Sequence, residues 1–310
     1  MQIQGFQIGH AHDPKLNSGV TVVVPDIPAT AAVHVMGGAP GTRETDLLAP
    51  EQLVQTVDAV VLSGGSAFGL DAASGMQAWL REQDRGYPVG VSRVPIVPSA
   101  ICFDLNNGGD KNWGRYPPYR ELGYEAATQI TRLPAEGSVG AGIGATTAGG
   151  RGGFGLAEQS LDGGVNITAA VVCNAVGSVY VGETEHFWAA PFEKDGEFGG
   201  LGLPHPMPDN SCVLSTKGST NPVENTTLAI VMTNAKLTQA ECKRVAINAH
   251  DGFARAIYPV HTPSDGDLVF VLSSNQIDLS STSVESIHMG TTAANTVARA
   301  IAKGVYLANK

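Results

Sequence analysis

The chain has 310 residues, of which 43% are hydrophobic and only 15% are charged, and its formal net charge is -10. This length fits one large domain or two small ones, and the acidic balance argues against nucleic acid and anionic membrane surfaces as partners. No stretch of the sequence reaches the roughly 18 consecutive apolar residues that a membrane-spanning helix needs.

The composition also bears on assembly and compartment. Low charge together with 38 glycines indicates a compact body with many tight loops, or a subunit that hides surface in an oligomer. Residues 1–12 show neither the basic nor the apolar region of a signal peptide, so we expect a cytoplasmic protein. The four cysteines are far apart, without a CxxC motif, and we expect buried free thiols at Cys102, Cys173, Cys212 and Cys242.

The first half of the chain alternates apolar runs with glycine-rich turns. Helical spacing of apolar side chains predicts helices over residues 69–84 and 121–133, and the polar, Gly/Pro-rich residues 106–119 are expected to be a loop. Runs rich in β-branched apolar residues predict strands over residues 19–24, 31–35, 58–62 and 101–105.

A glycine-dense segment, residues 137–155, opens the second half. Strands are expected over residues 169–173 and 179–181. The following residues, 183–224, are irregular and contain four prolines between 204 and 222, which makes them the most linker-like part of the chain.

The last part of the chain has the clearest elements. Apolar runs predict strands over residues 228–232 and 268–272. Helices are expected over 238–257 and 282–307, because each begins with a threonine followed three residues later by a glutamate, the pattern of a capping box. Strands and helices are mixed without strict βαβ alternation, which predicts a layered α/β or α+β domain.

The glycine-dense segment is a weak candidate for nucleotide binding. Gly140, Gly142 and Gly144 form GxGxG instead of the GxGxxG of dinucleotide-binding folds, and the GK[ST] of a phosphate loop is absent. The glycines are better explained as a backbone that turns closely around a site. Arg151 is the lone cation of the segment, and from the residues alone it is either a solvated or salt-bridged side chain or a site residue.

Ser66 lies between an expected strand and an expected helix, the context of a nucleophile elbow. The GxSxG pattern fails, because Phe68 stands where the second glycine should be. A serine hydrolase that uses Ser66 and a simple glycine-rich turn capped by Ser66 both remain open. The eight histidines form no HExxH motif, and we expect no metal site.

Thr226 directly precedes an apolar strand and follows the linker-like segment. A threonine hydroxyl needs a base to become a nucleophile. If the bond after Asn225 is cut, the new α-amine of Thr226, with a pKa of about 7.7, can be that base. Asp265 and Asp267 are two residues apart, so both side chains can lie on one face of an extended chain and hold the ammonium. A solvated turn is the other interpretation of this pair.

These segments together resemble the self-processing L-aminopeptidase/D-Ala-esterase/amidase family, which includes the β-peptidyl aminopeptidases and the nylon-oligomer endo-hydrolase. The resemblance runs over nearly the whole chain. It is carried by RETDLL (43–48), VVLSGGSAFGLDAA (60–73), ICFDL (101–105), GAGIGA (140–145), GGRGG (149–153), VVCNAVG (171–177), NTTLAIVMTN (225–234) and HTPSDGDLVF (261–270).

The resemblance implies a single αββα sandwich of the N-terminal-nucleophile-hydrolase type. It implies a precursor that cuts itself into a large fragment, 1–225, and a small fragment, 226–310, which stay together. It further implies a small peptide or amide as the substrate, no metal or organic cofactor, and assembly into a homo-oligomer, with a tetramer expected.

Individual roles follow from the same resemblance. Thr226 becomes the new N-terminus and the nucleophile once its bond to Asn225 is cut. Asp265 and Asp267 match the acidic pair that orients the nucleophile. Asn174 matches the asparagine whose side-chain amide polarises the scissile carbonyl.

Two residues depart from the family pattern. Arg151 stands where members often have lysine, and arginine keeps the charge but cannot act as a base. Phe103 falls where a tyrosine can assist the oxyanion, so another group must replace that hydroxyl. Oxyanion or loop support is expected from Gly64, Gly65, Ser66 and Gly142. A family member that binds without catalysing is a third alternative, beside the threonine enzyme and the Ser66 hydrolase.

Overall fold

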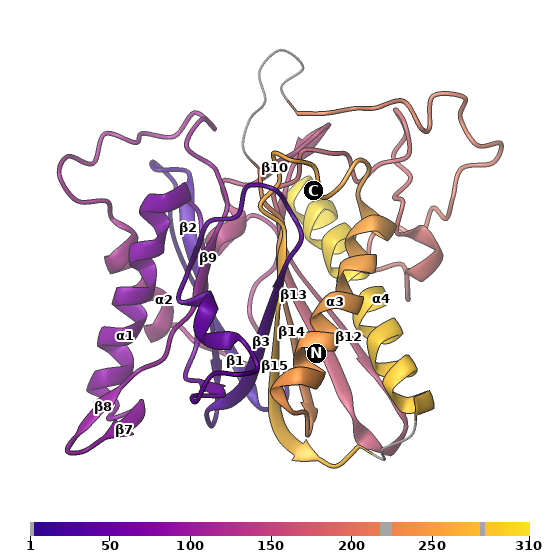
Figure 1. Cartoon of the computed structure of the whole chain (residues 1–310). Coiled ribbons are helices and arrows are strands. Elements are labelled where there is room, and N and C mark those ends of the chain that lie inside the picture. The colour runs from indigo at the N-terminus through magenta and orange to yellow at the C-terminus, as the bar shows by residue number, and fades with distance from the viewer. Residues whose placement is uncertain (1–2, 218–224, 280–282) are drawn as a thin grey trace.

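Two β-sheets lie face to face in the chain, and a pair of helices covers the outer side of each sheet (Figure 1). The structure is a computed structural model that describes residues 3–217, 225–279 and 283–310. The layers are those of the αββα sandwich that the sequence resemblance implies.

The N-terminal sheet has five strands, in the order β1-β2-β6-β9-β4. β6 and β9 are parallel, and the other neighbours are antiparallel. Its outer helices are α1 (Ala72–Glu82), preceded by the 3-10 turn η2 (Ser66–Asp71), and α2 (Tyr119–Thr128). The strands are β1 (Phe6–Asp13), β2 (Ser18–Pro25), β6 (Val60–Ser63), β9 (Ser99–Ile101) and β4 (Thr42–Arg43).

The second sheet has six strands, in the order β12-β13-β14-β15-β3-β5. β14 and β15 are parallel, with Leu228 opposite Leu268, so these two strands begin at the same edge of the sheet. The strands are β12 (Gly153–Ser160), β13 (Asn166–Cys173), β14 (Leu228–Ala235), β15 (Leu268–Ile277), β3 (Ala29–Val35) and β5 (Thr56–Val57).

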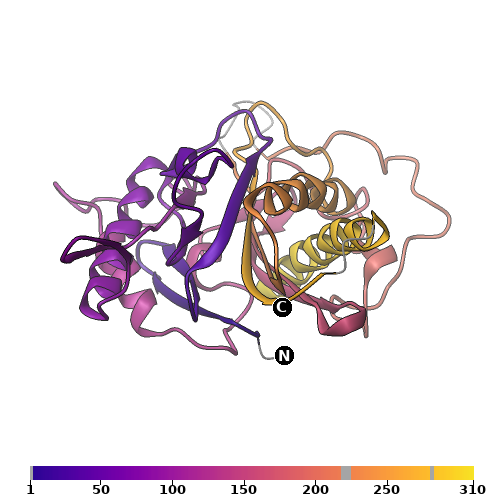
Figure 2. The ribbon, with the colours of Figure 1, turned by 60° about the horizontal axis from the view of Figure 1, so that its bottom comes forward.

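The outer side of the second sheet carries α3 (Gln239–Ala256) and α4 (Ser283–Ala308), which lie side by side (Figure 2). Small hairpins and 3-10 turns complete the chain: β7 (Tyr87–Val89) with β8 (Ser92–Val94), β10 (Thr146–Thr147) with β11 (Gly150–Arg151), and the turns η1 (Thr45–Leu48), η3 (Gly140–Gly142), η4 (Asp162–Gly164) and η5 (Ala190–Phe192).

Alternation along the strands divides the core into layers. Leu228 and Ile230 of β14 point into the apolar cluster between the two sheets, whereas Ala229 and Val231 point into the cluster beneath α3 and α4. Both sets are fully buried, which is why the strand reads as a continuous apolar run instead of an alternating one. The start of β14 at Leu228 is therefore held in place by packing on both faces of the strand.

Contacts with α4 explain a strand that the sequence analysis did not predict. β12 begins in the glycine-dense segment, because α4 approaches its backbone closely. A Cβ atom at Gly155 would lie 2.1 Å from the carbonyl oxygen of Ala300, so only glycine fits. The glycines that suggested a loop here lack a Cβ atom, and this lets the helix pack tightly on the strand.

The other strong predictions agree with the structure, with corrections at their ends. The capping box of α3 is present, with Thr238 accepting from the backbone N–H of Glu241. The strand expected over 101–105 is wrong, because β9 ends at Ile101, and the helix expected to reach residue 133 ends at Thr128. β1 was not expected, and residues 179–181 form only an isolated bridge instead of a strand.

Thr282, half of the second predicted capping box, lies outside the described residues. Three cysteines are buried free thiols, as expected, but Cys212 is exposed, so that part of the cysteine prediction is wrong. Among the described helices, none is both long and apolar enough to cross a membrane.

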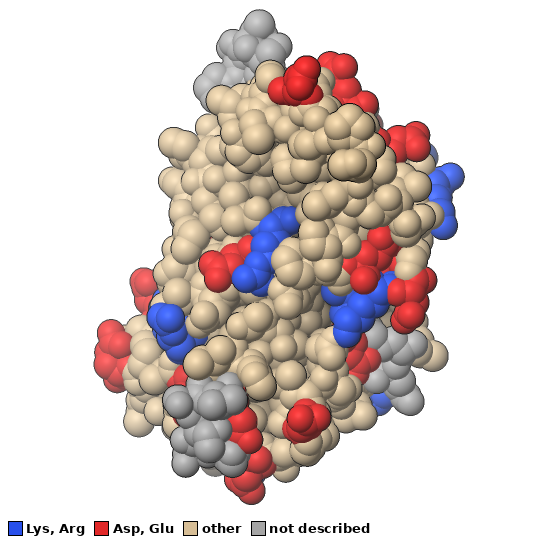
Figure 3. Space-filling view, turned by 90° about the vertical axis from the view of Figure 1, so that its right-hand side faces the viewer, with Lys and Arg blue, Asp and Glu red and all other residues tan. Residues whose placement is uncertain are grey.

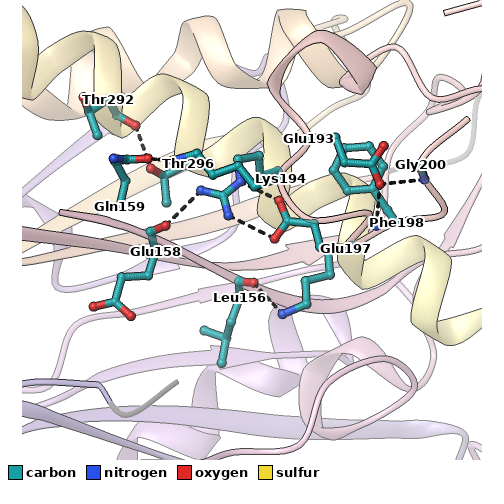
Figure 4. A network of polar contacts seen from close by, with 12 residues as sticks. Leu156, Glu158, Gln159, Glu193, Lys194, Glu197, Phe198, Gly200, Thr292 and Thr296 are labelled. Carbon is teal, nitrogen blue, oxygen red and sulfur yellow. Dashed lines mark hydrogen bonds and ion pairs between the residues drawn. The ribbon is translucent and has the colours of Figure 1, made fainter. Parts of the chain in front are cut away.

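The irregular segment that precedes β14 is anchored on α4. Glu197 accepts two hydrogen bonds from the guanidinium of Arg299, at 2.5 and 3.0 Å, and both side chains are largely buried. The neighbouring Glu193 accepts from the backbone N–H groups of Phe198 and Gly200, so its carboxylate closes the local turn (Figure 4). The described part of this segment therefore has a defined path although it has no strand or helix longer than one turn.

Candidate active site

The junction between Asn225 and Thr226 lies at the sheet edge where β14 and β15 begin. Thr226 is 2% exposed. Its backbone N–H donates to the carbonyl oxygen of Asn174 at 2.8 Å, and its hydroxyl donates to the carbonyl oxygen of Asn225 at 2.6 Å. The hydroxyl is thus in contact with the carbonyl group of the peptide bond that precedes it.

The loop before β15 holds the same peptide from the other side. The backbone N–H of Asn225 donates to Ser264 O at 3.0 Å, and the N–H of Gly266 donates to the Asn225 carbonyl oxygen at 2.7 Å. Residue 266 must be glycine, because a Cβ atom there would lie 2.5 Å from Thr226 Oγ1 and 2.6 Å from Ala39 O. The Asn225 carbonyl oxygen therefore already accepts a hydrogen bond. This is the oxygen that would become negatively charged if a nucleophile attacked the carbonyl carbon.

Asp265 and Asp267 flank this glycine, and both carboxylates are buried. Asp265 accepts from the Val176 N–H at 3.2 Å and from the backbone and hydroxyl of Thr262 at 2.9 and 2.8 Å. Asp267 accepts from the N–H of Thr227 at 2.8 Å. The pair is therefore not a solvated turn. Asp267 holds the backbone that follows the junction, at Thr227, and Asp265 ties Val176 to the loop residue Thr262.

His261 completes the environment of Asp267. Its Nδ1 lies 2.8 Å from Asp267 Oδ2, and its backbone N–H lies 3.3 Å from the same oxygen. Burial raises the pKa of Asp267 above its usual range, while the hydrogen bond from His261 works in the opposite direction. The sequence analysis did not single out His261, although it stands in the HTPSDGDLVF segment.

Asn174 follows the last residue of β13 and is fully buried. Its Oδ1 accepts from the N–H of Thr146 at 3.0 Å, and its Nδ2 donates to the carbonyl oxygen of Phe103 at 3.0 Å. Because one partner can only donate and the other can only accept, the orientation of the amide is fixed. Phe103 enters the site through its main chain, and its ring supplies no hydroxyl.

Lys217 is a second site residue that sequence reasoning missed. Its Nζ lies 2.5 Å from Asn225 Oδ1, 3.2 Å from Asn174 Oδ1 and 3.3 Å from Thr146 O. Burial lowers its pKa to about 8. The residue lies in the linker-like segment, and the only signal available in the sequence was its position eight residues before Asn225.

A pocket of 360 Å³ opens beside this cluster. Lys217, Thr146 and Phe103 form the part of its wall that contacts Asn174. Arg151 also lines the pocket, but it is exposed and its backbone pairs with Thr146 and Asn309. The structure therefore places Arg151 on the pocket wall, and Lys217 is the cation that contacts the junction.

The four residues expected to give oxyanion or loop support all have N–H groups that already donate within the protein. Gly64 donates to Gly19 O at 2.9 Å, Ser66 to Cys102 O at 3.1 Å and Gly142 to Val139 O at 2.9 Å. Gly65 donates to the carboxylate of Asp104 at 2.7 Å.

Gly65 supports the pocket through this hydrogen bond, since Asp104 is one of the pocket's lining residues. Burial raises the pKa of Asp104, and its hydrogen bond from Ser18, at 2.6 Å, opposes that shift.

A family model described as peptidase family S58 matches residues 1–310. The chain belongs to peptidase family S58. As a member of this family it is an enzyme that hydrolyses amide bonds. Within the described ranges, no three His, Cys, Asp or Glu side chains are grouped as they would be around a metal ion.

Relatives of this S58 chain include uncharacterized aminopeptidases of Mycobacterium tuberculosis and Mycobacterium bovis. Each is 40% identical over 325 residues, covering 98% of this chain and 92% of the relative. A 6-aminohexanoate-oligomer endohydrolase of Kocuria is 28% identical over 289 residues, covering 90% of this chain and 75% of the relative.

Solved structures with the same fold include the L-aminopeptidase D-Ala-esterase/amidase of Ochrobactrum anthropi, described as a variant of the Ntn hydrolase fold. Its TM-score is 0.70 at 18% identity, with 97% of this chain and 84% of the other covered. A β-aminopeptidase of Burkholderia gives 0.68 at 18% identity over the same shares of each chain. These likenesses confirm the predicted αββα fold of N-terminal-nucleophile-hydrolase type.

Proposed function

We propose that this S58 chain cuts itself between Asn225 and Thr226 and then hydrolyses amide bonds with Thr226 as its N-terminal nucleophile. The observation that carries the proposal is the junction itself. The Thr226 hydroxyl lies 2.6 Å from the oxygen of the preceding carbonyl, and that oxygen also receives the Gly266 N–H at 2.7 Å. A nucleophile and an oxyanion donor therefore meet at one peptide bond.

Self-cleavage proceeds in two steps. The Thr226 oxygen attacks the carbonyl carbon of Asn225, the C–N bond breaks, and the hydroxyl proton goes to the leaving nitrogen, which becomes the α-amine of Thr226. Water then hydrolyses the ester and releases the carboxylate of Asn225. The Gly266 N–H stabilises the charge on the carbonyl oxygen, and such a donor is typically worth about 2.7–4 kcal/mol of barrier.

Turnover uses the amine made by that cleavage. The neutral α-amine of Thr226 takes the hydroxyl proton while the oxygen attacks the substrate amide, and it then returns the proton to the leaving nitrogen. Asn174 O, which accepts from the Thr226 N–H at 2.8 Å in the intact chain, holds the amine in place. Because a free α-amine has a pKa of about 7.7, hydrolysis should rise with pH through that region.

The pocket supplies the route for substrate. In the intact chain Thr226 does not line the pocket. Lys217 does line it, and its ammonium is bonded to the side chain of Asn225. Cleavage turns Asn225 into a chain end, which can move and connect the pocket with Thr226. The proposed enzyme is therefore closed to substrate until it has processed itself.

We infer an aminoacyl amide as the substrate class, with an α-, β- or ω-amino group. This rests on the relatives, which are named as aminopeptidases and as a 6-aminohexanoate-oligomer endohydrolase, and on a solved neighbour named as a β-aminopeptidase. A panel of aminoacyl p-nitroanilides and amide oligomers separates the three kinds. A small peptide or amide is the only partner this chemistry requires, and it requires no cofactor.

The Ser66 alternative finds little support at its own position. Ser66 starts the turn η2 with φ of 52°, and its backbone N–H donates to Cys102 O. Among the hydrogen bonds of the described residues, none joins the Ser66 hydroxyl to a histidine or carboxylate that would serve as its base.

Denaturing gel electrophoresis of the purified chain tests the proposal. We expect two fragments that copurify under native conditions, a large one of about 23 kDa and a small one of about 9 kDa, scaled from the 32.1 kDa chain by residue count. A single band of full length in a protein that hydrolyses amides would remove self-cleavage from the mechanism.

We further propose that the enzyme is a homo-oligomer, with a dihedral tetramer as the expected form. The β7–β8 hairpin exposes Val89, Val91 and Val94 at 56%, 106% and 46%, and the face seen in Figure 3 has broad areas without acidic or basic side chains. Exposed apolar side chains and weakly charged surface are each typical of subunit contacts. Light scattering at micromolar concentration should give about four times 32.1 kDa, and a monomer would contradict the assembly.

A further inference from the structure

We propose that Lys217 is a positioning residue for self-cleavage, whose ammonium ties the side chain of Asn225 to that of Asn174 and so holds the acyl half of the scissile peptide against the nucleophile. This inference rests on the proposed self-cleavage. Lys217 stands outside every motif of the family resemblance given above, and its contacts are visible only in the folded chain.

The connection runs through Asn174. The main-chain oxygen of Asn174 accepts the N–H of Thr226, and its side-chain Oδ1 lies 3.2 Å from Lys217 Nζ. The same Nζ lies 2.5 Å from Asn225 Oδ1. One residue at the end of β13 is thus linked to both sides of the bond to be cut, directly to Thr226 and through the ammonium to Asn225.

The three contacts of Nζ match the donors of an ammonium. All three partners are carbonyl-type oxygens, Asn225 Oδ1, Asn174 Oδ1 and Thr146 O, and an ammonium has three N–H groups to give them. A neutral amine has only two N–H groups, and its lone pair would face one of these oxygens. The geometry therefore fits the charged form, which can clamp but cannot act as a base.

The backbone of Lys217 is placed as firmly as its side chain. Its N–H donates to Val176 O at 2.9 Å, and Val176 in turn donates its own N–H to Asp265. The clamp therefore shares a support with the acidic pair. Misplacement of reacting groups by about 1 Å can cost 10²-fold in rate, which sets the size of the expected effect.

The clamp should depend on pH in a way that a purely structural lysine would not. Burial lowers the pKa of Lys217 to about 8, so the ammonium is lost as the pH rises through that value, and self-cleavage should slow. The ionisable groups within electrostatic reach of Lys217 are Cys102, Cys173, Asp104 and Asp265, with Arg151 on the same pocket wall.

These neighbours do not obscure the effect. Burial raises the pKa of the Cys173 thiol to about 12 and that of Cys102 above its usual range, so neither thiol ionises between pH 7 and 9. Arg151 keeps its charge throughout. The negative charges of Asp104 and Asp265 favour the ammonium form of Lys217.

Cell-free synthesis of the full chain, followed by a chase at set pH and gel analysis, measures the cleavage rate. For the wild type we expect a fall of about tenfold from pH 7 to pH 9, the loss of a clamp that titrates near 8. Lys217→Met should cleave about 10²-fold more slowly at pH 7, without that alkaline fall. Lys217→Arg should recover part of the rate and also lack the fall, because its charge persists.

Lys243→Met is the matched control, since Lys243 is another half-buried lysine whose Nζ donates to a main-chain oxygen, that of Val33, at 2.6 Å, away from the pocket. It should cleave at the wild-type rate with the wild-type pH profile. If the wild type cleaves and Lys217→Met cleaves equally fast, the role of Lys217 is overturned while the proposed function stands. An alkaline fall that persists in Lys217→Arg would have the same meaning. A wild-type chain that never cleaves would overturn the proposed function together with the role of Lys217.

Discussion

Thr226→Ala should yield a single full-length band and no amide hydrolysis. In the proposed mechanism this substitution removes the one atom that attacks in both reactions, and loss of a hydrolase nucleophile can cost on the order of 10⁶ in rate. Thr226→Val removes the hydroxyl while keeping the branched shape of a side chain that is 2% exposed, so it separates chemistry from packing. Band patterns on denaturing gels and release of p-nitroaniline give the two readouts.

Thr226→Ser is the complementary variant, since serine supplies the same hydroxyl. It should retain part of both activities, lowered by the freer rotation of a side chain without the second branch. If the alanine and valine variants both process and hydrolyse, the nucleophile lies elsewhere. Ser66→Ala, which we expect to leave both reactions intact, then becomes the decisive comparison.

Replacing either carboxylate of the loop before β15 should slow self-cleavage and turnover together. Asp265→Asn places an amide where a carboxylate now accepts from Val176 and Thr262, and Asp267→Asn does so opposite Thr227 and His261. An orienting carboxylate of this kind can be worth about 10⁴ in rate. Initial rates, with thermal unfolding to confirm the fold, measure the effect.

Asp251→Asn serves as the control for this pair, because Asp251 is an exposed carboxylate on α3. It should behave as wild type. Wild-type rates in both the Asp265 and Asp267 variants would show that the carboxylates only hold the loop, and the amine of Thr226 would then depend on Asn174 O for its orientation.

The sequence predicted the two strands that frame the junction because both are buried on two faces. Leu228 to Met232 and Leu268 to Leu272 are uninterrupted apolar runs, and runs this short favour a buried strand over a helix. Glycines had the opposite effect. Gly155 sits in β12 because Ala300 of α4 leaves no room for a Cβ atom, a long-range contact that local propensity does not reveal.

The site residues also divide into those that a local pattern predicts and those that only the folded chain brings together. Thr226, Asn174, Asp265 and Asp267 stand in segments with specific motifs, and the fold brings all four together within one hydrogen-bonded cluster. Arg151 was expected there as the cation of a motif, yet it lies exposed on the pocket wall. Lys217 reaches the cluster from a segment with no regular structure of its own, so its place depends on the path of the chain around α4, which no short pattern encodes.

N-terminal sequencing of the small fragment, combined with its intact mass, decides whether Thr226 is the nucleophile. We expect a fragment of about 9 kDa by residue count that begins Thr-Thr-Leu-Ala, the sequence from residue 226. The same preparation should hydrolyse an aminoacyl amide. A fragment that begins at any other residue in an active preparation would contradict Thr226 as the nucleophile, as would an active chain that remains whole.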